Sequence, residues 1–385
     1  MTVSLRLPAR SRARALQGHP WVFANELREP LPEALAGKAC DLRDARGHFL
    51  GSGIANPHSV IAWRRFSRDP RNLDAAFLRE ALSAAVARRA DEPLRRLVWS
   101  ESDDLPGLVV DQYEDLLVVQ IATLALDRST RVVGELLAEL LSPQEIVWRN
   151  DAPTRRREGL PVGVTTRSGK PADPRWVRVG EVELWLDAMV GHKTGLYLDQ
   201  RREYARVGAV AAGRRVLDCF CYGGGFALHC ARAGAASVLG LDASEAAVAT
   251  ARRAAERNGL ADAVELRAVN VFDYLSAERE ARFDLVVLDP PPFARSQRTL
   301  DRALRGYKEI HLRALRLLEP GGILVTYTCS HHIGRDAFLG LIGSAALDAR
   351  RSVRVLEHCH QPPDHPILPG MPESEYLRGF VLGVD

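Results

Sequence analysis

The chain has 385 residues, a length that exceeds one typical hydrophobic core and predicts two or three domains. Its 52 lysines and arginines nearly balance 49 aspartates and glutamates, and the formal net charge is +3. Any affinity for nucleic acid must therefore come from local patches and not from bulk charge. The sequence shows neither a signal peptide nor a long apolar span, so we expect no membrane partner.

The six cysteines lie in apolar or motif contexts, and this usage favours a reducing, cytoplasmic setting. Cys219 and Cys221 are close enough to suggest a metal site. However, no second cysteine pair and no His-x-x-x-His pattern accompanies them at zinc spacing. We therefore expect buried structural thiols at these positions and assign no metal.

The first part of the chain, from residue 3 to residue 66, consists of short alternating runs. These runs are broken by turn-forming residues, namely Gly37, Gly47, Gly51, Gly53 and Pro57. The pattern indicates a small, turn-rich β domain, followed by a plausible linker at Arg68-Asp69-Pro70.

The next part mixes helical and strand patterns. Apolar residues at helical spacing predict helices over 73–89 and 132–141, and apolar runs predict strands at 108–111, 116–123 and 146–149. Together they indicate a compact α+β unit. Arg155-Arg156-Arg157 opens a stretch punctuated by glycine and proline, which predicts an exposed loop. Contact with phosphate and a simple solvated surface are both open for these arginines.

From residue 214 onward, strands and helices alternate, which is typical of βαβ units on a mostly parallel sheet. The expected strands are 215–220, 237–242, 263–270, 283–289, 322–328, 353–360 and 376–384. The last two follow the final helix and are separated by a proline-rich loop, so a terminal antiparallel pair is expected. The predicted fold class is α/β, with a seven-stranded, doubly wound sheet.

Residues 218–226 close the first of these strands with a glycine-rich turn that lets the backbone approach a ligand. Asp242 ends the next strand, where a carboxylate can accept both hydroxyls of an adenosine ribose. The alternatives are that Asp242 only caps the following helix, or that the cofactor is a nicotinamide nucleotide. Asn270 could pair with an adenine edge, and Phe272 could stack beside it or fill the core. The expected contacts are therefore Asp218, Tyr222, Gly223, Gly224, Phe226, Asp242, Asn270 and Phe272, and they fit an adenosine-bearing cofactor.

Two short motifs close the two strands that follow, Asp289-Pro290-Pro291-Pro292-Phe293 and Thr328-Cys329-Ser330. Because open α/β sheets bind ligands at the carboxyl edge of their strands, we expect a carboxylate, an aromatic ring and a thiol to meet there. That combination suits chemistry on a nucleobase.

With these motifs, the chain resembles the PUA-containing ribosomal RNA large-subunit 5-methylcytosine methyltransferases, which use S-adenosyl-L-methionine. The resemblance extends over nearly the full length. Its further motifs are His19-Pro20-Trp21-Val22-Phe23, the run from Gly191 to Arg201, and Arg305-Gly306-Tyr307-Lys308. The sequence departs from the family at Pro292, where lysine is common, and at Asn270, where aspartate is common. At these positions we expect the base orientation and the adenine contact to differ in detail from the family, with the core chemistry kept.

The resemblance implies three domains: a PUA RNA-binding domain over 1–68, a middle α+β domain over 71–180 and a Rossmann-like methyltransferase domain over 185–385. It also implies large-subunit (23S) ribosomal RNA as the partner and leaves a homodimer open. In the run after Gly191, Tyr197, Asp199 and Gln200 are expected to line the methionine end of the cofactor, together with Asp289. Lys193 could touch phosphate or lie on the surface, and His192 is expected to order this loop.

The chemistry of cytosine assigns the expected catalytic roles. Carbon 5 is a poor nucleophile until a nucleophile adds to carbon 6, and a thiolate suits that addition. Cys329 is the cysteine best placed for it, and Asp289 would share a proton with ring nitrogen 3. Pro290 and Pro291 would fix the backbone there, and Phe293 would stack on the extruded base. The base that removes the carbon-5 proton is unassigned, with His331 as a guess.

Three other functions stay open at this point. A guanine-nitrogen methyltransferase could hold its amine with the Asp-Pro-Pro-aromatic motif and would not need Cys329. A non-catalytic RNA-binding factor could keep the sheet without the reaction. A nicotinamide oxidoreductase is more distant, because hydride transfer does not require Asp289 and Cys329 together.

Overall fold

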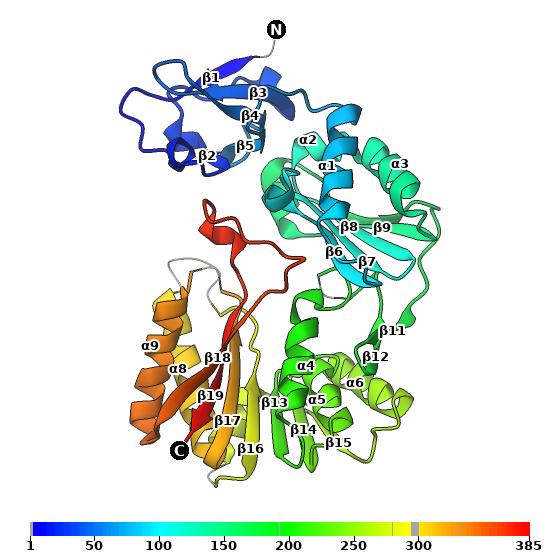
Figure 1. Ribbon diagram of the computed structural model, residues 1–385, viewed down its shortest axis with the longest axis vertical. Coiled ribbons are helices and arrows are strands. Elements are labelled where there is room, and N and C mark those ends of the chain that lie inside the picture. Colours follow the sequence, from blue (N-terminus) through cyan, green and yellow to red (C-terminus); the bar gives the residue numbers. More distant parts are fainter. Residues whose placement is uncertain (1–2, 192, 279, 294–299, 331) are drawn as a thin grey trace. The chain divides into compact units, whose positions relative to one another are not determined.

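The computed structural model describes residues 3–191, 193–278, 280–293, 300–330 and 332–385 (Figure 1). The chain forms two compact units and crosses between them more than once. The first unit consists of Met1–Pro174, Leu186–Leu198 and Pro363–Ser374. The second consists of Arg175–Trp185, Asp199–Pro362 and Glu375–Asp385. Each unit is described by itself.

The amino-terminal part of the first unit is a five-stranded sheet with the order β1-β3-β4-β5-β2. Its strands are β1 (Ser4–Arg6), β2 (Trp21–Phe23), β3 (Lys38–Arg43), β4 (Phe49–Ala55) and β5 (Ile61–Ser67). Short 3-10 helices, η1 (Arg14–Gln17), η2 (Ala24–Glu26) and η3 (Glu33–Leu35), lie between them. Trp63 is fully buried, and a Cβ on Gly53 would lie 2.2 Å from its ring, so only glycine fits there. The predicted small β domain is confirmed.

The rest of the first unit is built on a second sheet with the order β10-β9-β8-β7-β6. Its strands are β6 (Leu94–Trp99), β7 (Leu108–Tyr113), β8 (Leu116–Ile121), β9 (Glu145–Asn150) and β10 (Gly163–Thr166). The helices α1 (Ala75–Ala87), α2 (Leu124–Asp127) and α3 (Thr130–Leu141) and the 3-10 helices η4 (Ser100–Asp103) and η5 (Pro153–Glu158) complete it. The predicted helices and strands are present, and β6 and β10 are additional.

Strand β6 was not predicted from the sequence, because Arg95 and Arg96 interrupt its apolar pattern. Arg96 is buried, and its guanidinium donates to both carboxylate oxygens of Asp111 at 2.7 and 2.8 Å. Arg95 donates from Nε to Gln112 Oε1 at 2.8 Å. Both partners lie on the neighbouring strand β7, so cross-strand pairing allows polar side chains inside a buried strand.

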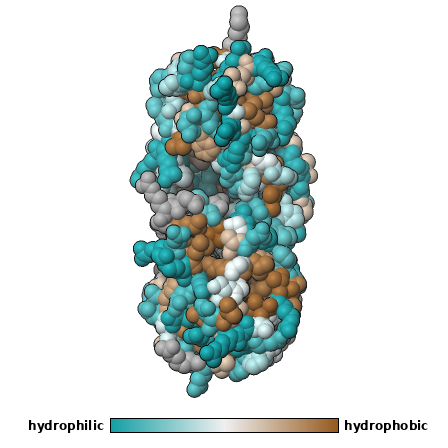
Figure 2. All heavy atoms as spheres, turned by 90° about the vertical axis from the view of Figure 1, so that its left-hand side faces the viewer, coloured by the Kyte–Doolittle hydropathy of each residue, from teal (hydrophilic) through white to brown (hydrophobic). Residues whose placement is uncertain are grey.

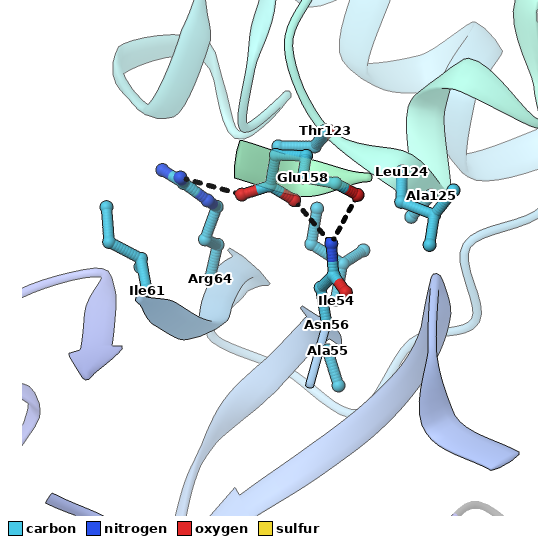
Figure 3. Close-up of a pocket in the computed structure, with 9 residues that line it drawn as sticks. All are labelled: Ile54, Ala55, Asn56, Ile61, Arg64, Thr123, Leu124, Ala125 and Glu158. Atoms are coloured by element: carbon cyan, nitrogen blue, oxygen red, sulfur yellow. Dashed lines mark hydrogen bonds and ion pairs between the residues drawn. The ribbon is translucent and has the colours of Figure 1, made fainter. Parts of the chain in front are cut away.

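A buried carboxylate joins the two sheets of the first unit. Glu158, at the end of η5, accepts from Asn56 Nδ2 at 2.8 Å and from Arg64 Nη2 at 3.4 Å (Figure 3). It also accepts from Ser59 Oγ at 2.5 Å. Residues of β4, β5, α2 and η5 line a small pocket at this junction: Ile54, Ala55, Asn56, Ile61, Arg64, Thr123, Leu124, Ala125 and Glu158. All polar contacts named here tie the amino-terminal sheet to the middle part of the chain.

The prediction of an exposed loop at the three consecutive arginines was wrong for Arg155. Arg156 and Arg157 are exposed, but Arg155 is buried within η5. Its guanidinium donates to the carbonyls of Ile121 and Pro161 and to Asp127 Oδ1. Because three acceptors, one of them a carboxylate, bind its guanidinium, Arg155 holds the loop against the domain.

The second unit is organised around a seven-stranded sheet with the order β15-β14-β13-β16-β17-β19-β18. Its strands are β13 (Arg215–Cys219), β14 (Ser237–Asp242), β15 (Val264–Ala268), β16 (Phe283–Leu288), β17 (Leu318–Thr328), β18 (Val353–His360) and β19 (Arg378–Val384). Strands β13 to β17 run parallel, whereas β19 pairs antiparallel with both β17 and β18. The predicted fold class and the terminal antiparallel pair are confirmed.

Helices flank this sheet, and a hairpin of β11 (Arg175–Val179) and β12 (Val182–Leu186) precedes it. The helices are α4 (Arg201–Ala209), α5 (Gly225–Arg232), α6 (Glu245–Arg257), α7 (Val271–Ala277), α8 (Leu300–Leu317) and α9 (Arg335–Ala349). Helices α8 and α9 pack together on one side, and α4 packs on α5 on the other (Figure 1). The face that bears α9 shows apolar patches among hydrophilic side chains (Figure 2). Among the helices of the described residues, none is long and apolar enough to span a bilayer.

Candidate active site

The carboxyl ends of four parallel strands bring the predicted site residues to one edge of the sheet. Cys219 is paired in register with Leu241 and with Leu288, and Leu288 is paired with Thr326. The strands β13, β14, β16 and β17 therefore end close together. Their terminal side chains and those just beyond are Asp218, Asp242, Asp289 and Cys329. This is the edge at which doubly wound sheets bind ligands.

Asp218 is a fully buried carboxyl group. Its Oδ2 accepts from the backbone N–H of Ala227 at 2.9 Å, whereas Oδ1 has no hydrogen-bond partner among the described residues. Burial, helped by the nearby charges of Asp289 and Asp242, raises the pKa of Asp218 to about 8. A buried oxygen without a partner at a strand end is suited to receive a polar group of a ligand.

The turn after β13 adopts an unusual backbone. Phe220 and Tyr222 have φ values of 67° and 46°, in the left-handed region that residues with a side chain rarely adopt. A Cβ on Gly223 would meet no atom within 4 Å, so this glycine leaves open space beside the turn. By contrast, a Cβ on Gly225 would lie 2.5 Å from the Tyr204 ring. The turn is thus tightly packed on the Gly225 side and open on the Gly223 side.

Asp242 holds this turn from the neighbouring strand. Its Oδ2 accepts from the Tyr222 N–H at 3.0 Å, and its Oδ1 accepts from the Ser244 N–H at 2.8 Å. The cap of α6 is Ser244, whose side chain accepts from the Ala247 N–H. Asp242 is therefore not the helix cap, and each of its oxygens keeps a further lone pair for a ligand hydroxyl.

Asn270 and Phe272 follow β15. The Asn270 side-chain oxygen caps α7 by accepting from the N–H groups of Phe272 and Asp273. Only its amide nitrogen is left to recognise an adenine edge. The Phe272 ring lies 6.4 Å from the Phe220 ring and 5.7 Å from the Phe293 ring, between centroids. It thus joins the turn after β13 to the segment after β16.

A glutamine from a distant part of the chain orients Asp289. Gln200 Nε2 donates to Asp289 Oδ2 at 3.0 Å, and the buried Gln200 Oε1 has no partner among the described residues. The adjacent Asp199 is fixed by the Tyr376 hydroxyl, which donates to its Oδ2 at 2.7 Å. The structure therefore places Asp199, Gln200 and Asp289 in the second unit together with the turn after β13.

Lys193 and Tyr197 belong to the first unit, where the Lys193 Nζ lies 4.5 Å from the centre of the Tyr197 ring. Their loop is anchored to β7, because the Thr194 hydroxyl donates to Asp111 at 2.6 Å and hydrogen-bonds the Tyr113 hydroxyl at 2.8 Å. Contacts of Lys193 with phosphate and of Tyr197 with a cofactor stay predictions. His192 and His331 lie outside the described residues.

Cys329 differs from the other five cysteines, all of which are described and none of which forms a disulfide. Cys40, Cys219, Cys221, Cys230 and Cys359 are buried, and burial raises the pKa of each of these thiols. Cys329 alone is partly exposed, one residue beyond β17. A thiol at this place can reach a ligand, whereas the other five cannot.

The segment after Asp289 is partly open as well. Pro290 is buried, Pro291 and Pro292 are exposed, and Phe293 is half-buried. The Phe293 ring also lies 4.6 Å from the ring of Tyr307 on α8. The sequence singled out the motif that contains Tyr307 but gave that residue no role.

Comparisons with known proteins agree with this geometry. A family profile described as an S-adenosylmethionine-dependent methyltransferase matches residues 162–373, and one described as a PUA-like domain matches residues 5–68. The chain is 38% identical, over the full length of both proteins, to the ribosomal RNA large subunit methyltransferase I of Shewanella denitrificans.

Among solved structures, a SAM-dependent methyltransferase from Streptococcus mutans covers 99% of this chain and all of its own, with a TM-score of 0.85 and 18% identity. A methyltransferase solved in complex with S-adenosylhomocysteine matches with a TM-score of 0.83 and 17% identity, over 99% of this chain and all of its own. These two similarities show the fold. The chain belongs to the family of S-adenosylmethionine-dependent methyltransferases represented by the ribosomal RNA large subunit methyltransferase I proteins. Its cofactor is S-adenosylmethionine, and it has an amino-terminal PUA-like domain.

Proposed function

We propose that this protein forms 5-methylcytosine in large-subunit ribosomal RNA through a covalent adduct of Cys329. The observation that supports it most is the position of a partly exposed thiol one residue beyond β17, on the strand adjacent to the one that Asp289 follows. The ribosomal RNA substrate rests on the name of relatives at 36–38% identity over the full chain, together with the PUA-like domain.

The cofactor site fits the residues present. Asp218 Oδ1, which has no partner in the described part of the chain, the open space at Gly223 and the carboxylate of Asp242 offer acceptors and room for an amine, a chain that lies close to the backbone and a ribose. Tyr222 and Gly224 belong to the same turn, and Phe226 follows it as a buried residue at the start of α5. Asn270 and Phe272 are proposed to hold the adenine. When bound, S-adenosylmethionine supplies an electrophilic methyl group to the base.

The residues of this chain supply the rest of the reaction. The Cys329 thiolate adds to carbon 6 of cytosine, and this bond makes carbon 5 nucleophilic. Asp289 shares a proton with ring nitrogen 3, which accepts the negative charge that develops on the ring. Gln200 donates to Asp289 Oδ2 and so fixes the plane of that carboxylate. After methylation, carbon 5 loses its proton to a base, and the thiolate leaves as the double bond between carbons 5 and 6 reforms.

Phe293 and the prolines before it complete the proposed base pocket. Pro291 is exposed, and Phe293 is half-buried against Phe272 and Tyr307, so one face of the aromatic group can stack on an extruded base. Lys193 is proposed to contact the RNA backbone, and Tyr197 to line the cofactor. The domain boundaries, a cytoplasmic location and a homodimer are part of this proposal; exposed apolar side chains such as Leu347 of α9 offer surface for the last.

The test is methyl transfer from labelled cofactor to unmodified ribosomal RNA, with the methylated nucleoside identified by mass, for the wild type and Cys329→Ala in parallel. The proposal expects 5-methylcytidine with the wild type and none with the variant. A methylated guanosine from both proteins would replace it with nitrogen methylation. Absence of any methylation, with RNA binding retained in Asp242→Ala, would point to a non-catalytic RNA-binding factor.

A further inference from the structure

Tyr307 is a fully buried residue of α8 that contacts two separate segments of the chain. The Thr328 hydroxyl donates to the Tyr307 hydroxyl at 3.0 Å, and the Ser330 hydroxyl lies 3.3 Å from it. The Phe293 ring packs against the Tyr307 ring, with 4.6 Å between the centroids. Thr328 and Ser330 flank Cys329, and Phe293 ends the proline segment that begins after Asp289.

Phe293 and Ser330 lie beyond the strand ladder, because β16 ends at Leu288 and β17 ends at Thr328. Thr328 itself is the last residue of β17 and pairs with Arg378. Tyr307 therefore links the two segments to each other, through its hydroxyl to the residues that flank Cys329 and through its ring to Phe293.

Tyr307 is itself firmly placed. One turn further along α8, His311 hydrogen-bonds the Tyr307 carbonyl at 2.6 Å through Nδ1 and the Thr326 hydroxyl at 2.8 Å through Nε2. Burial lowers the pKa of His311 to about 4, so this bridge between α8 and β17 is uncharged at neutral pH. Burial also raises the pKa of Tyr307 to about 12, and the nearby Cys329 charge acts in the same direction. The hydroxyl thus stays protonated beside the thiol.

We propose that Tyr307 is a positioning residue that holds Cys329 and the Asp289–Phe293 segment in one fixed geometry. The inference rests on the proposed function, in which a thiolate and a carboxyl group act on two positions of the same ring. Both groups must be placed at once, and a displacement of about 1 Å can reduce a rate by about 100-fold. One side chain of α8 that holds the first segment by its hydroxyl and the second by its ring provides that placement.

The experiment compares Tyr307→Phe with the wild type and with Tyr327→Phe. Phenylalanine keeps the ring and removes only the hydroxyl. Tyr327→Phe removes a hydroxyl at similar depth whose hydrogen bond goes to Glu203 and touches neither segment, so it controls for lost stability. We expect kcat for methyl transfer to fall by about 10- to 100-fold in Tyr307→Phe. We expect KM for cofactor and RNA to stay within about two-fold, and Tyr327→Phe to keep the wild-type kcat.

A second variant distinguishes a shared role from two separate effects. Ser330→Ala removes one of the two hydrogen-bond partners of the Tyr307 hydroxyl and is expected to lower kcat by a smaller factor. If both residues act through the same link, the double variant Tyr307→Phe/Ser330→Ala falls no further than Tyr307→Phe alone. The rate of adduct formation with RNA that contains 5-fluorocytosine, whose carbon 5 cannot lose a proton, is expected to fall in step with kcat.

The outcomes separate this inference from the function on which it rests. If the wild type forms 5-methylcytidine, Cys329→Ala does not, and Tyr307→Phe keeps full kcat, only the inference about Tyr307 is overturned. It is equally overturned if Tyr327→Phe loses as much kcat as Tyr307→Phe, because lost stability then explains both. If the wild type forms no 5-methylcytidine at all, the proposed function is overturned, whatever the variants do.

Discussion

Replacement of Asp218 by asparagine tests the electrostatics of the cofactor site directly. The wild-type carboxyl group is fully buried and has a pKa of about 8, first because of its burial and then because of the Asp289 and Asp242 charges. At neutral pH, the ligand-free protein therefore holds it protonated. Asparagine has the shape of that neutral acid and keeps an oxygen that can accept from the Ala227 N–H.

The sign of the effect follows from proton linkage. Between the unfolded pKa of about 4 and the folded pKa of about 8, the folded state binds a proton that the unfolded state has lost. The free energy of unfolding of the wild type therefore falls by about 1.4 kcal/mol for each pH unit over this window through Asp218 alone. The asparagine variant lacks this contribution. Its stability relative to the wild type should rise with pH, by roughly 3 kcal/mol between pH 5 and pH 7.

The assay is denaturation by urea at pH 5, 6, 7 and 8 without cofactor, for the wild type and Asp218→Asn. Asp284→Asn is a suitable control, because the Arg215 ion pair lowers the pKa of Asp284 to about 2. In the wild type, Asp284 is ionised in both the folded and the unfolded state throughout this pH range. The stability difference between the wild type and Asp284→Asn should therefore not change with pH. A difference for Asp218→Asn that is equally flat would refute the assignment of a neutral, buried Asp218.

Three further outcomes are expected. Asp242→Ala should weaken cofactor binding by about 10- to 100-fold, because the Asp242 carboxylate holds the turn after β13 and is proposed to bind the ribose. An unchanged affinity in calorimetry would contradict this. Gly225→Ala should lower stability by about 1–3 kcal/mol in thermal unfolding, because its Cβ would clash with the Tyr204 ring, and a neutral effect would speak against that packing. Glu158→Gln should destabilise the first unit by about 2 kcal/mol, because the contacts with Asn56 and Arg64 weaken. Unchanged resistance of the variant to proteolysis would disprove this.

Sequence patterns predicted most of the secondary structure for a simple reason. Strands β14 and β18 have the predicted bounds, because the spacing of apolar residues between polar turns is a local pattern that indicates a strand. Strand β6 was missed where that local signal fails. Its two arginines are satisfied by residues of β7, and such a pairing is not visible until the strands are placed side by side.

The same limit applies to the three consecutive arginines. A run of charge next to glycine and proline indicates a solvated loop, and this holds for Arg156 and Arg157. Arg155 is buried because acceptors from separate segments converge on its guanidinium. The cost of burying a charge depends on its partners, and the local sequence does not contain them.

The sequence by itself determined the doubly wound fold, the glycine-rich turn and the two motifs that end at Phe293 and Ser330, because each is a contiguous pattern at a strand end. Only the tertiary structure decided which side chains act on those motifs. Gln200 reaches Asp289 across 89 residues of chain, and Tyr307 contacts the segments before and after α8 through its ring and its hydroxyl. The raised pKa of Asp218 likewise arises from burial and from carboxylates on other strands. Contacts and electrostatic effects of this kind depend on distances in space, which the spacing of residues along the chain does not specify.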